Sequence, residues 1–368
     1  MSSSTTTAKK VFKIVPKKDN PNPTPTPTPP PPPRRKLRMI DLFAGTGAFT
    51  HAFESTGEVE CVFANDMVEW SKSLYDTNFN HKLTLGNLNE VNVEDIPPHD
   101  ILTGGFPCQP FSIAGRQEGF QDERSNVFWK ILKIIDHHKP MFVILENVKN
   151  LLSHDEKATF ETIKSNLEKK GYNIQFKVLN TADITGIPQH RERIYIVCIR
   201  KDNTDGSTDV AGIFKNFTLD FPSIPKASIS EMLETKPVPS KYYYTEKSAT
   251  WGLVSASVLK KNTVYQYRRV YVRENKSNEC PTLTANMGGG GHNVPLILDN
   301  ADGGGIRKLT PRECFNFQGF PASYILPTTI SDTNLYKLAG NAVSLPVVQL
   351  IAKRLIGLAR GSHPSSSS

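Results

Sequence analysis

LRMIDLFAGTG, residues 37–47, is the stretch that decides the fold this sequence predicts. It reads as an apolar strand ending in a glycine turn, and glycine lets a ligand approach the backbone because no Cβ stands in the way. Asp66 lies 21 residues beyond Gly45 at the end of the next apolar run, where a carboxylate can accept hydrogen bonds from two ribose hydroxyls. A GxG turn alone also occurs as a simple tight turn, but the two features together predict a nucleoside cofactor.

Apolar runs alternate with amphipathic stretches from residue 37 to residue 200. Strands are predicted at 37–43, 59–64, 100–103, 141–145 and 193–199, and helices at 49–55, 126–138 and 155–169. This alternation predicts an α/β fold with a mostly parallel sheet covered on both faces. Ligands bind such sheets at the carboxyl ends of the strands. Gly45, Asp66, Cys108 and Glu146 lie at or just past such ends, so we expect the site there.

The rest of the chain divides by composition. Residues 1–36 are rich in Pro and Thr and predict a disordered basic arm, either a plain tether or a segment that binds phosphates. The predicted domains are 37–200 for cofactor and catalysis, 201–306 for a small β-rich domain, 307–334 for a return segment, 335–358 for a C-terminal helix broken at Gly340-Asn341, and 359–368 for a disordered tail.

Charge and cysteine usage narrow the class of protein. The net charge of +8 lies in residues 1–38, which hold nine basic residues and one acidic residue, so a nucleic-acid surface on the neutral remainder must be a local patch. The five cysteines form no CxxC pair, which favours a reducing, intracellular compartment without zinc. The sequence has no apolar run near 18 residues, so we expect no membrane segment.

GGFPCQPFS, residues 104–112, is the strongest chemical signal. Pro107 and Pro110 bracket Cys108 in a glycine-fed turn, which indicates a positioned thiol, although a merely buried cysteine is the alternative. The other four cysteines lie within or beside apolar runs and are predicted to be packing residues.

Two further motifs place charged groups near strands. Glu146 ends an apolar strand in ENV and is either a solvated turn residue or a group in the cleft. Arg191 and Arg193, in QHRER, point the same way on an extended segment and could hold phosphate or a base, or form a surface ion pair with Glu192.

In their order, these motifs resemble the cytosine-C5 DNA methyltransferase family. The matching stretches are DLFAGTGAF, FANDM, GGFPCQPFS, ENV, QHRERIYIV, RKLTPRECFNFQGFP and YKLAGNAVSLPVV, and the resemblance covers residues 38–356. It implies a Rossmann-like class I methyltransferase domain with a smaller β-rich target-recognition domain. It also implies a DNA (cytosine-5-)-methyltransferase of the restriction-modification type that acts on double-stranded DNA. Such an enzyme uses S-adenosylmethionine, yields S-adenosylhomocysteine and needs no metal; we expect a monomer in a bacterial cytoplasm or, if viral, inside the host cell.

The resemblance implies roles for individual residues. Cys108 is the nucleophile at C6 of a flipped cytosine, Glu146 holds N3 and the amino group, Arg193 pairs with the O2 edge and with Glu146, and Arg191 contacts phosphate or a loop. The cofactor residues are Phe43, Gly45, Gly47, Asp66, Met67, Asn87, Leu88, Pro107, Val127, Asn341 and Val343. Asn87 stands where the family usually has an acidic residue, so we expect altered cofactor affinity.

DNA contacts are expected from two regions. The active-site loop supplies Gln109, Ser112, Arg116 and Arg124. In residues 264–273, strict alternation would place Tyr265, Tyr267, Arg269, Tyr271 and Arg273 on one basic, aromatic face. An amphipathic strand with its polar face in water is the alternative.

Three other functions predict different motifs. An adenine amino-methyltransferase should carry a [DN]PP[YFW] tetrapeptide, which this sequence lacks. An RNA cytosine-C5 methyltransferase should carry Cys-Phe-Thr, for which Cys314-Phe315-Asn316 is the nearest approach. A catalytically silent DNA-binding homologue would not need the intact PCQ, ENV and QxRxR set. The target sequence and a partner endonuclease stay open.

Overall fold

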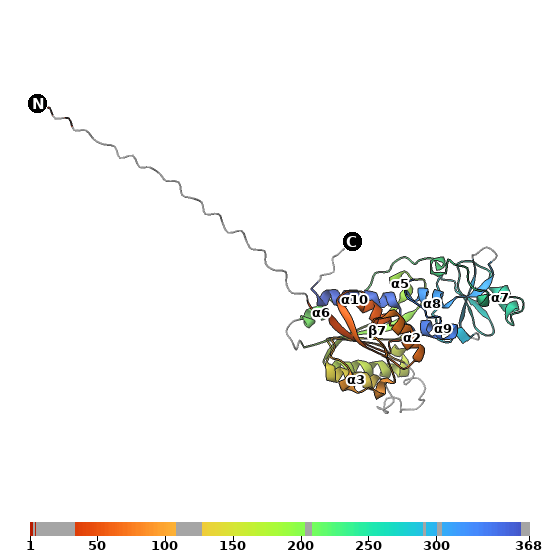
Figure 1. Ribbon diagram of the computed structural model, residues 1–368, viewed down its shortest axis with the longest axis horizontal. Helices are drawn as coiled ribbons and strands as arrows, with labels where there is room; N and C mark the ends of the chain where they lie inside the picture. The colour runs from red at the N-terminus through yellow and green to blue at the C-terminus, as the bar shows by residue number, and fades with distance from the viewer. Residues whose placement is uncertain are drawn as a thin grey trace. The chain divides into compact units, whose positions relative to one another are not determined.

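The computed structural model describes residues 1–2, 4, 34–107, 127–202, 208–289, 292–299 and 304–361. The chain divides into two units, Met1–Arg35 and Lys36–Ser368. All the described helices and strands lie in the second unit (Figure 1).

A seven-stranded sheet forms the centre of this unit. Its strands are β1 (Leu37–Leu42), β2 (Val59–Asp66), β3 (Thr84–Leu85), β4 (Ile101–Gly105), β5 (Phe142–Val148), β6 (Tyr172–Asn180) and β7 (Glu192–Arg200). They lie in the order β3-β2-β1-β4-β5-β7-β6. Among the described strands of this sheet, β7 runs antiparallel to the other six. The predicted mostly parallel α/β fold is confirmed.

Helices cover both faces of this sheet. The described helices are α1 (Ala48–Glu54), α2 (Glu69–Asn78), α3 (Val127–His138), α4 (Ala158–Lys169), α5 (Thr181–Thr185), α6 (Val210–Asn216), α7 (Trp251–Ser257), α8 (Pro311–Phe317), α9 (Asp332–Asn341) and α10 (Leu345–Ala359), of which α7 packs with the second sheet described below. Figure 1 shows α10 and α3 on opposite faces. Along β1, Met39 packs into the core on the side of α1 and α10, and Ile40 packs into the core on the side of α3 and α4. The strand is therefore apolar on both sides, as its sequence predicts.

The C-terminal break lies later than predicted. The sequence placed it at Gly340-Asn341, but α9 continues through Asn341 and α10 begins at Leu345. Gly340 is helical, and a Cβ there would lie only 2.2 Å from the carbonyl carbon of Thr284. The residue thus allows α9 to pack closely against the small-domain chain and does not end the helix.

Among the described residues, no single helix is both long and apolar enough to span a membrane. Only the bent pair of α9 and α10, taken together, has a sufficient length and composition.

A second, four-stranded antiparallel sheet follows in the chain. It consists of β8 (Tyr265–Tyr267), β9 (Val272–Glu274), β10 (Val294–Leu298) and β11 (Ile306–Lys308), in the order β11-β10-β8-β9. It packs on a separate small core that includes Val254, Tyr265 and Leu296. The structure therefore contains the second, smaller β-sheet that the resemblance implies.

A buried ionic network ties this second sheet to α8. Arg307 of β11, 1% exposed, donates to both carboxylate oxygens of Glu313 at 2.7 and 2.8 Å and to Asp299 at 2.7 Å. Glu313 also accepts from the backbone of Thr310 and so completes the cap of α8. Both carboxylate oxygens of Glu313 therefore have donors, and Arg307 is the cation that the two acidic side chains share.

Replacing Arg307 with Met should lower the free energy of unfolding by about 3–5 kcal/mol, since it leaves Glu313 as a buried carboxylate without its cation. Chemical denaturation measures the loss. A matched control is Lys164→Met, which breaks an exposed i,i+4 pair with Glu168 and should cost less than about 1 kcal/mol. Equal losses in the two variants would contradict this account of the network.

Candidate functional site

Cys108 and its neighbours Gln109, Ser112, Arg116 and Arg124 lie outside the described residues. The described chain reaches Pro107, which is exposed, two residues beyond the end of β4. Phe106 is buried, and its carbonyl accepts a hydrogen bond of 3.1 Å from the side chain of Asn147. The amide of the ENV motif therefore anchors the chain that leads into Cys108.

The turn after β1 forms a cradle beside the end of β2. Phe43, Gly45 and Gly47 all have left-handed backbones, with φ of 56°, 52° and 68°. The N–H of Gly45 donates to one carboxylate oxygen of Asp66 at 2.9 Å, and the N–H of Val68 donates to the other at 2.9 Å. Burial raises the pKa of Asp66, and these two backbone bonds act against that shift. A carboxylate fixed beside a glycine turn fits the ribose of a nucleoside.

Three other residues expected to bind the cofactor, Met67, Asn87 and Leu88, follow the ends of β2 and β3. Strand β3 pairs with the end of β2 and carries the chain toward Asn87 and Leu88. The amide oxygen of Asn87 accepts from the N–H of Asn89 at 3.1 Å and caps a short 3-10 turn. Leu88 is buried in the core, whereas Met67 is 70% exposed. Because an amide oxygen has a second lone pair, Asn87 still has acceptor capacity.

Gly105, the last residue of β4, brings two parts of the expected site together. A Cβ built on Gly105 would lie 3.2 Å from Cγ2 of Val343 and 3.6 Å from Oε2 of Glu146. Val343 comes from the segment between α9 and α10, Asn341 is exposed at the end of α9, and Val127 opens α3. The absence of a side chain at Gly105 therefore lets Val343, expected at the methionine end of the cofactor site, approach the carboxyl of Glu146.

Glu146 is a buried carboxyl paired with one arginine. It is 8% exposed, and its Oε1 lies 3.2 Å from Nε of Arg193. Burial raises the pKa of Glu146, and the positive charges of Arg193 and Arg191 oppose the shift. The antiparallel pairing of β5 with β7 sets this geometry, since Glu146 lies opposite Tyr195 and Val148 lies opposite Arg193.

Of the two contacts expected of Arg191, phosphate or a loop, the structure shows the second. Its side chain is buried and donates to the carbonyls of Leu283, Gly340 and Ala342 at 3.0, 3.2 and 2.6 Å. Burial lowers the pKa of Arg191 to about 9. The three carbonyls accept hydrogen bonds from its guanidinium. Arg191 therefore joins β7 to the small-domain chain and to the end of α9.

The expected single face of residues 264–273 is also wrong. The chain turns between β8 and β9, with Arg269 at φ 60°, so that Gln266 lies opposite Arg273 across a hairpin. Tyr265 and Tyr267 face the small core, and the hydroxyl of Tyr267 donates to the carbonyl of Arg269 at 2.9 Å. Arg269 and Tyr271 are exposed at the turn.

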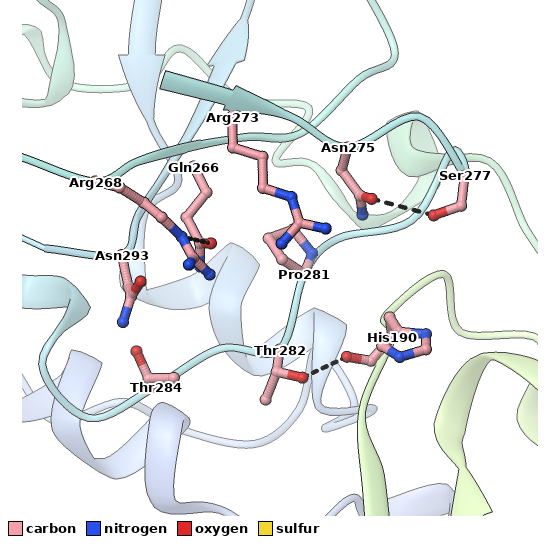
Figure 2. Close-up of a pocket in the computed structure, with 10 residues that line it drawn as sticks. All are labelled: His190, Gln266, Arg268, Arg273, Asn275, Ser277, Pro281, Thr282, Thr284 and Asn293. Atoms are coloured by element: carbon pink, nitrogen blue, oxygen red, sulfur yellow. Dashed lines mark hydrogen bonds between the residues drawn. The ribbon is translucent and has the colours of Figure 1, made fainter. Parts of the chain in front are cut away.

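An open groove lies between this hairpin and the segment before β7 (Figure 2). Its volume is about 350 Å³. We call it the hairpin groove; its lining residues are His190, Gln266, Arg268, Arg273, Asn275, Ser277, Pro281, Thr282, Thr284 and Asn293. Of these, only Arg273 was predicted from the sequence. All of them except His190 come from residues 266–293, and the turn of the hairpin brings them together.

The four described cysteines, Cys61, Cys198, Cys280 and Cys314, are all buried free thiols. Burial raises the pKa of each of them. A high pKa disfavours the nucleophilic thiolate, so these residues act in packing, as predicted.

The glycine cradle, the carboxylate at the end of β2 and the buried carboxyl at β5 define a Rossmann-like class I methyltransferase. A family model for C-5 cytosine-specific DNA methylases matches residues 37–357. The chain belongs to that family.

Named relatives agree with this assignment. The Type II methyltransferase M.Bsp6I of Bacillus sp. (strain RFL6) is 45% identical over 322 residues, which cover 87% of this chain and 98% of that protein. M.HhaI of Haemophilus parahaemolyticus is 38% identical over 324 residues, covering 86% and 93%. The crystal structure of a Spodoptera frugiperda DNMT2 mutant has a TM-score of 0.68 at 23% identity and covers 87% of this chain and all of that one. That likeness concerns the fold alone.

The Glu146–Arg193 pair predicts a pH dependence of stability. A carboxyl with a raised pKa keeps its proton in the folded protein while the unfolded chain releases it, so stability falls as pH rises above the ordinary Glu value of about 4.3. Arg193→Met removes an opposing charge and should steepen this fall between about pH 5 and pH 8, measured as the melting temperature. Adding Glu146→Gln removes the titrating carboxyl, so it should abolish this fall and leave a slope shallower than that of wild type. An unchanged slope in Arg193→Met alone would refute the coupling.

Proposed function

We propose that this protein methylates C5 of a cytosine that it flips out of duplex DNA, with Cys108 as the nucleophile. The observation that carries the proposal is the buried Glu146–Arg193 pair beside the end of β4, the strand that leads into the Cys108 loop. Membership of the C-5 cytosine-specific DNA methylase family favours this function over an RNA substrate or a silent homologue.

In the proposed reaction, the Cys108 thiolate adds to C6 of the cytosine. C5 then becomes enamine-like and nucleophilic, so one difficult step is divided into easier ones. Once C5 carries the methyl group, loss of the C5 proton and expulsion of the thiolate restore the aromatic ring.

Glu146 is proposed to bind the N3 edge of the flipped cytosine. Its raised pKa favours a protonated carboxyl, which can donate to N3 and draw electron density away from C6. Arg193 orients the carboxyl through the contact at Oε1, and the second oxygen, Oε2, faces Gly105. Arg193 is also proposed to donate to the O2 edge of the base.

S-adenosylmethionine, when bound, supplies the methyl group. Its proposed ribose partner is Asp66, whose carboxylate the backbone holds in place. Phe43 is proposed to pack on the adenine, with Met67, Asn87 and Leu88 beside it. Gly45 and Gly47 leave room for the cofactor. Pro107, Val127, Asn341 and Val343 are proposed to line the methionine end.

The DNA contacts proposed for the catalytic loop involve Gln109, Ser112, Arg116 and Arg124. Closing that loop over the flipped base excludes water and offsets the cost of unstacking, about a few kcal/mol. We further propose that the protein acts as a monomer without a metal, in a bacterial cytoplasm or, if viral, inside the host cell.

Replacing Cys108 with Ala should reduce methyl transfer from labelled cofactor to duplex DNA at least about a thousandfold, because the nucleophile is lost. Cys198→Ala, which alters a thiol buried in the core, is the matched control and should retain transfer. DNA containing 5-fluorocytosine should trap the wild-type protein covalently and leave Cys108→Ala free. Normal transfer by Cys108→Ala would rule out the proposed nucleophile.

Asp66→Ala should lower the affinity for S-adenosylmethionine about tenfold or more, since hydrogen bonds from the ribose to a carboxylate are lost. Calorimetric titration measures this change. The control is Glu69→Ala, an exposed acidic residue in the first turn of α2, which should leave the affinity unaltered. Wild-type affinity in Asp66→Ala would contradict the ribose assignment.

A further inference from the structure

The hairpin groove presents an unusual excess of hydrogen-bond donors. Its ten lining residues in the described chain include two arginines and neither Asp nor Glu. Figure 2 shows Gln266, Arg268 and Arg273 reaching from the hairpin into the same hollow. The groove therefore fits a ligand edge that offers several acceptors side by side.

Gln266 and Arg268 form one fixed unit. Nε of Arg268 donates to the amide oxygen of Gln266 at 2.7 Å, and Gln266 is only 4% exposed. This bond occupies the amide oxygen from one side and turns the remaining N–H groups of Arg268 and the NH₂ of Gln266 toward other acceptors.

Arg273 is the second donor. It lies opposite Gln266 in the pairing of β8 with β9, and its guanidinium has no hydrogen bond or ion pair within the part of the chain that the structure describes. An arginine held on a strand and directed into a hollow is suited to two parallel hydrogen bonds. In the major groove of DNA, guanine alone presents two adjacent acceptors, N7 and O6.

Asn293 supplies an acceptor in the same groove. Its Oδ1 is buried and, among the described residues, has no hydrogen-bond partner. Because Asn293 lines the groove, rotation of its amide presents this acceptor to a ligand bound there. The N4 amino group of cytosine is the donor that a G·C pair shows in the major groove.

We infer that the hairpin groove reads G·C pairs from the major groove, with Arg273 binding one guanine and the Arg268–Gln266 unit binding another. Asn293 accepts from the amino group of a cytosine in one of these pairs. The target site therefore contains guanine at two or more fixed positions besides the methylated cytosine. This inference rests on the proposed function, since it assumes that DNA is the substrate.

Arg269 provides a natural contrast. It lies at the exposed turn of the same hairpin and does not line the groove. Its neighbour Val270 is 82% exposed. An arginine in this position suits a phosphate, which fixes the protein on DNA without reading sequence.

The test is to produce the full-length protein in a bacterial host free of cytosine methylation and to map 5-methylcytosine by bisulfite sequencing. The wild-type motif should contain two fixed guanines. Arg273→Ala should lose the requirement for one of them and Arg268→Ala for the other. With purified protein, discrimination at that position should fall about tenfold or more in kcat/KM. Arg269→Ala should keep the motif and bind all duplexes more weakly.

Arg273→Gln makes the test sharper. Glutamine can pair with N6 and N7 of adenine, so this variant should shift the preference at one position from guanine toward adenine. The melting temperature and the affinity for S-adenosylmethionine, compared with wild type, show that each variant is folded.

The outcomes separate this inference from the proposed function. Absence of 5-methylcytosine with the wild-type protein would refute the proposed function. A wild-type motif without two fixed guanines would overturn only the inference. So would folded Arg273→Ala and Arg268→Ala variants that keep the full motif while losing affinity uniformly, because they would then contact phosphates.

Discussion

The buried guanidinium of Arg191 is the contact on which the arrangement of the site depends. Its three hydrogen bonds reach the carbonyl of Leu283 in one part of the chain and those of Gly340 and Ala342 in another. A buried charge without such partners would be costly, so these two segments and the start of β7 must meet at this point for the protein to be stable. Arg191 lies two residues before Arg193, so the same part of β7 also places Arg193 beside Glu146.

The segment that precedes β7 also positions the second sheet. The N–H of His190 donates to the carbonyl of Cys280, and the N–H of Cys280 donates to that of Pro188. The hydroxyl of Thr282 donates to the carbonyl of His190 at 2.6 Å (Figure 2). The hairpin groove is thus attached to the chain that continues into Arg191 and Arg193. Residues 188–193 therefore connect the hairpin groove to the start of β7, where Arg193 contacts Glu146.

The strands buried on both faces could be predicted from sequence, because β1, β4 and β5 are continuous apolar runs. Edge strand β6 escaped prediction, since much of it is solvent-facing and its pattern is mixed. The hairpin was misread for a physical reason: no Gly, Asn or Pro marks its turn, and Arg269 adopts the left-handed conformation instead. The cradle and the Glu146–Arg193 pair follow from ordered motifs, whereas the hairpin groove and the role of Arg191 depend on contacts between distant residues.

The small core beneath the hairpin has a consequence for how such an enzyme changes over time. Tyr265 and Tyr267 pack there with Val254 and Leu296, apart from the two cores that support the large sheet. Strands β8 and β9 contain only three residues each, and Gln266, Arg268 and Arg273 are not members of that apolar core. Changes at these groove positions therefore leave the apolar side chains of the cores beside the large sheet unaltered. A lineage, or a protein engineer, can explore new DNA sites by altering a few side chains while the machinery for methylation is inherited intact.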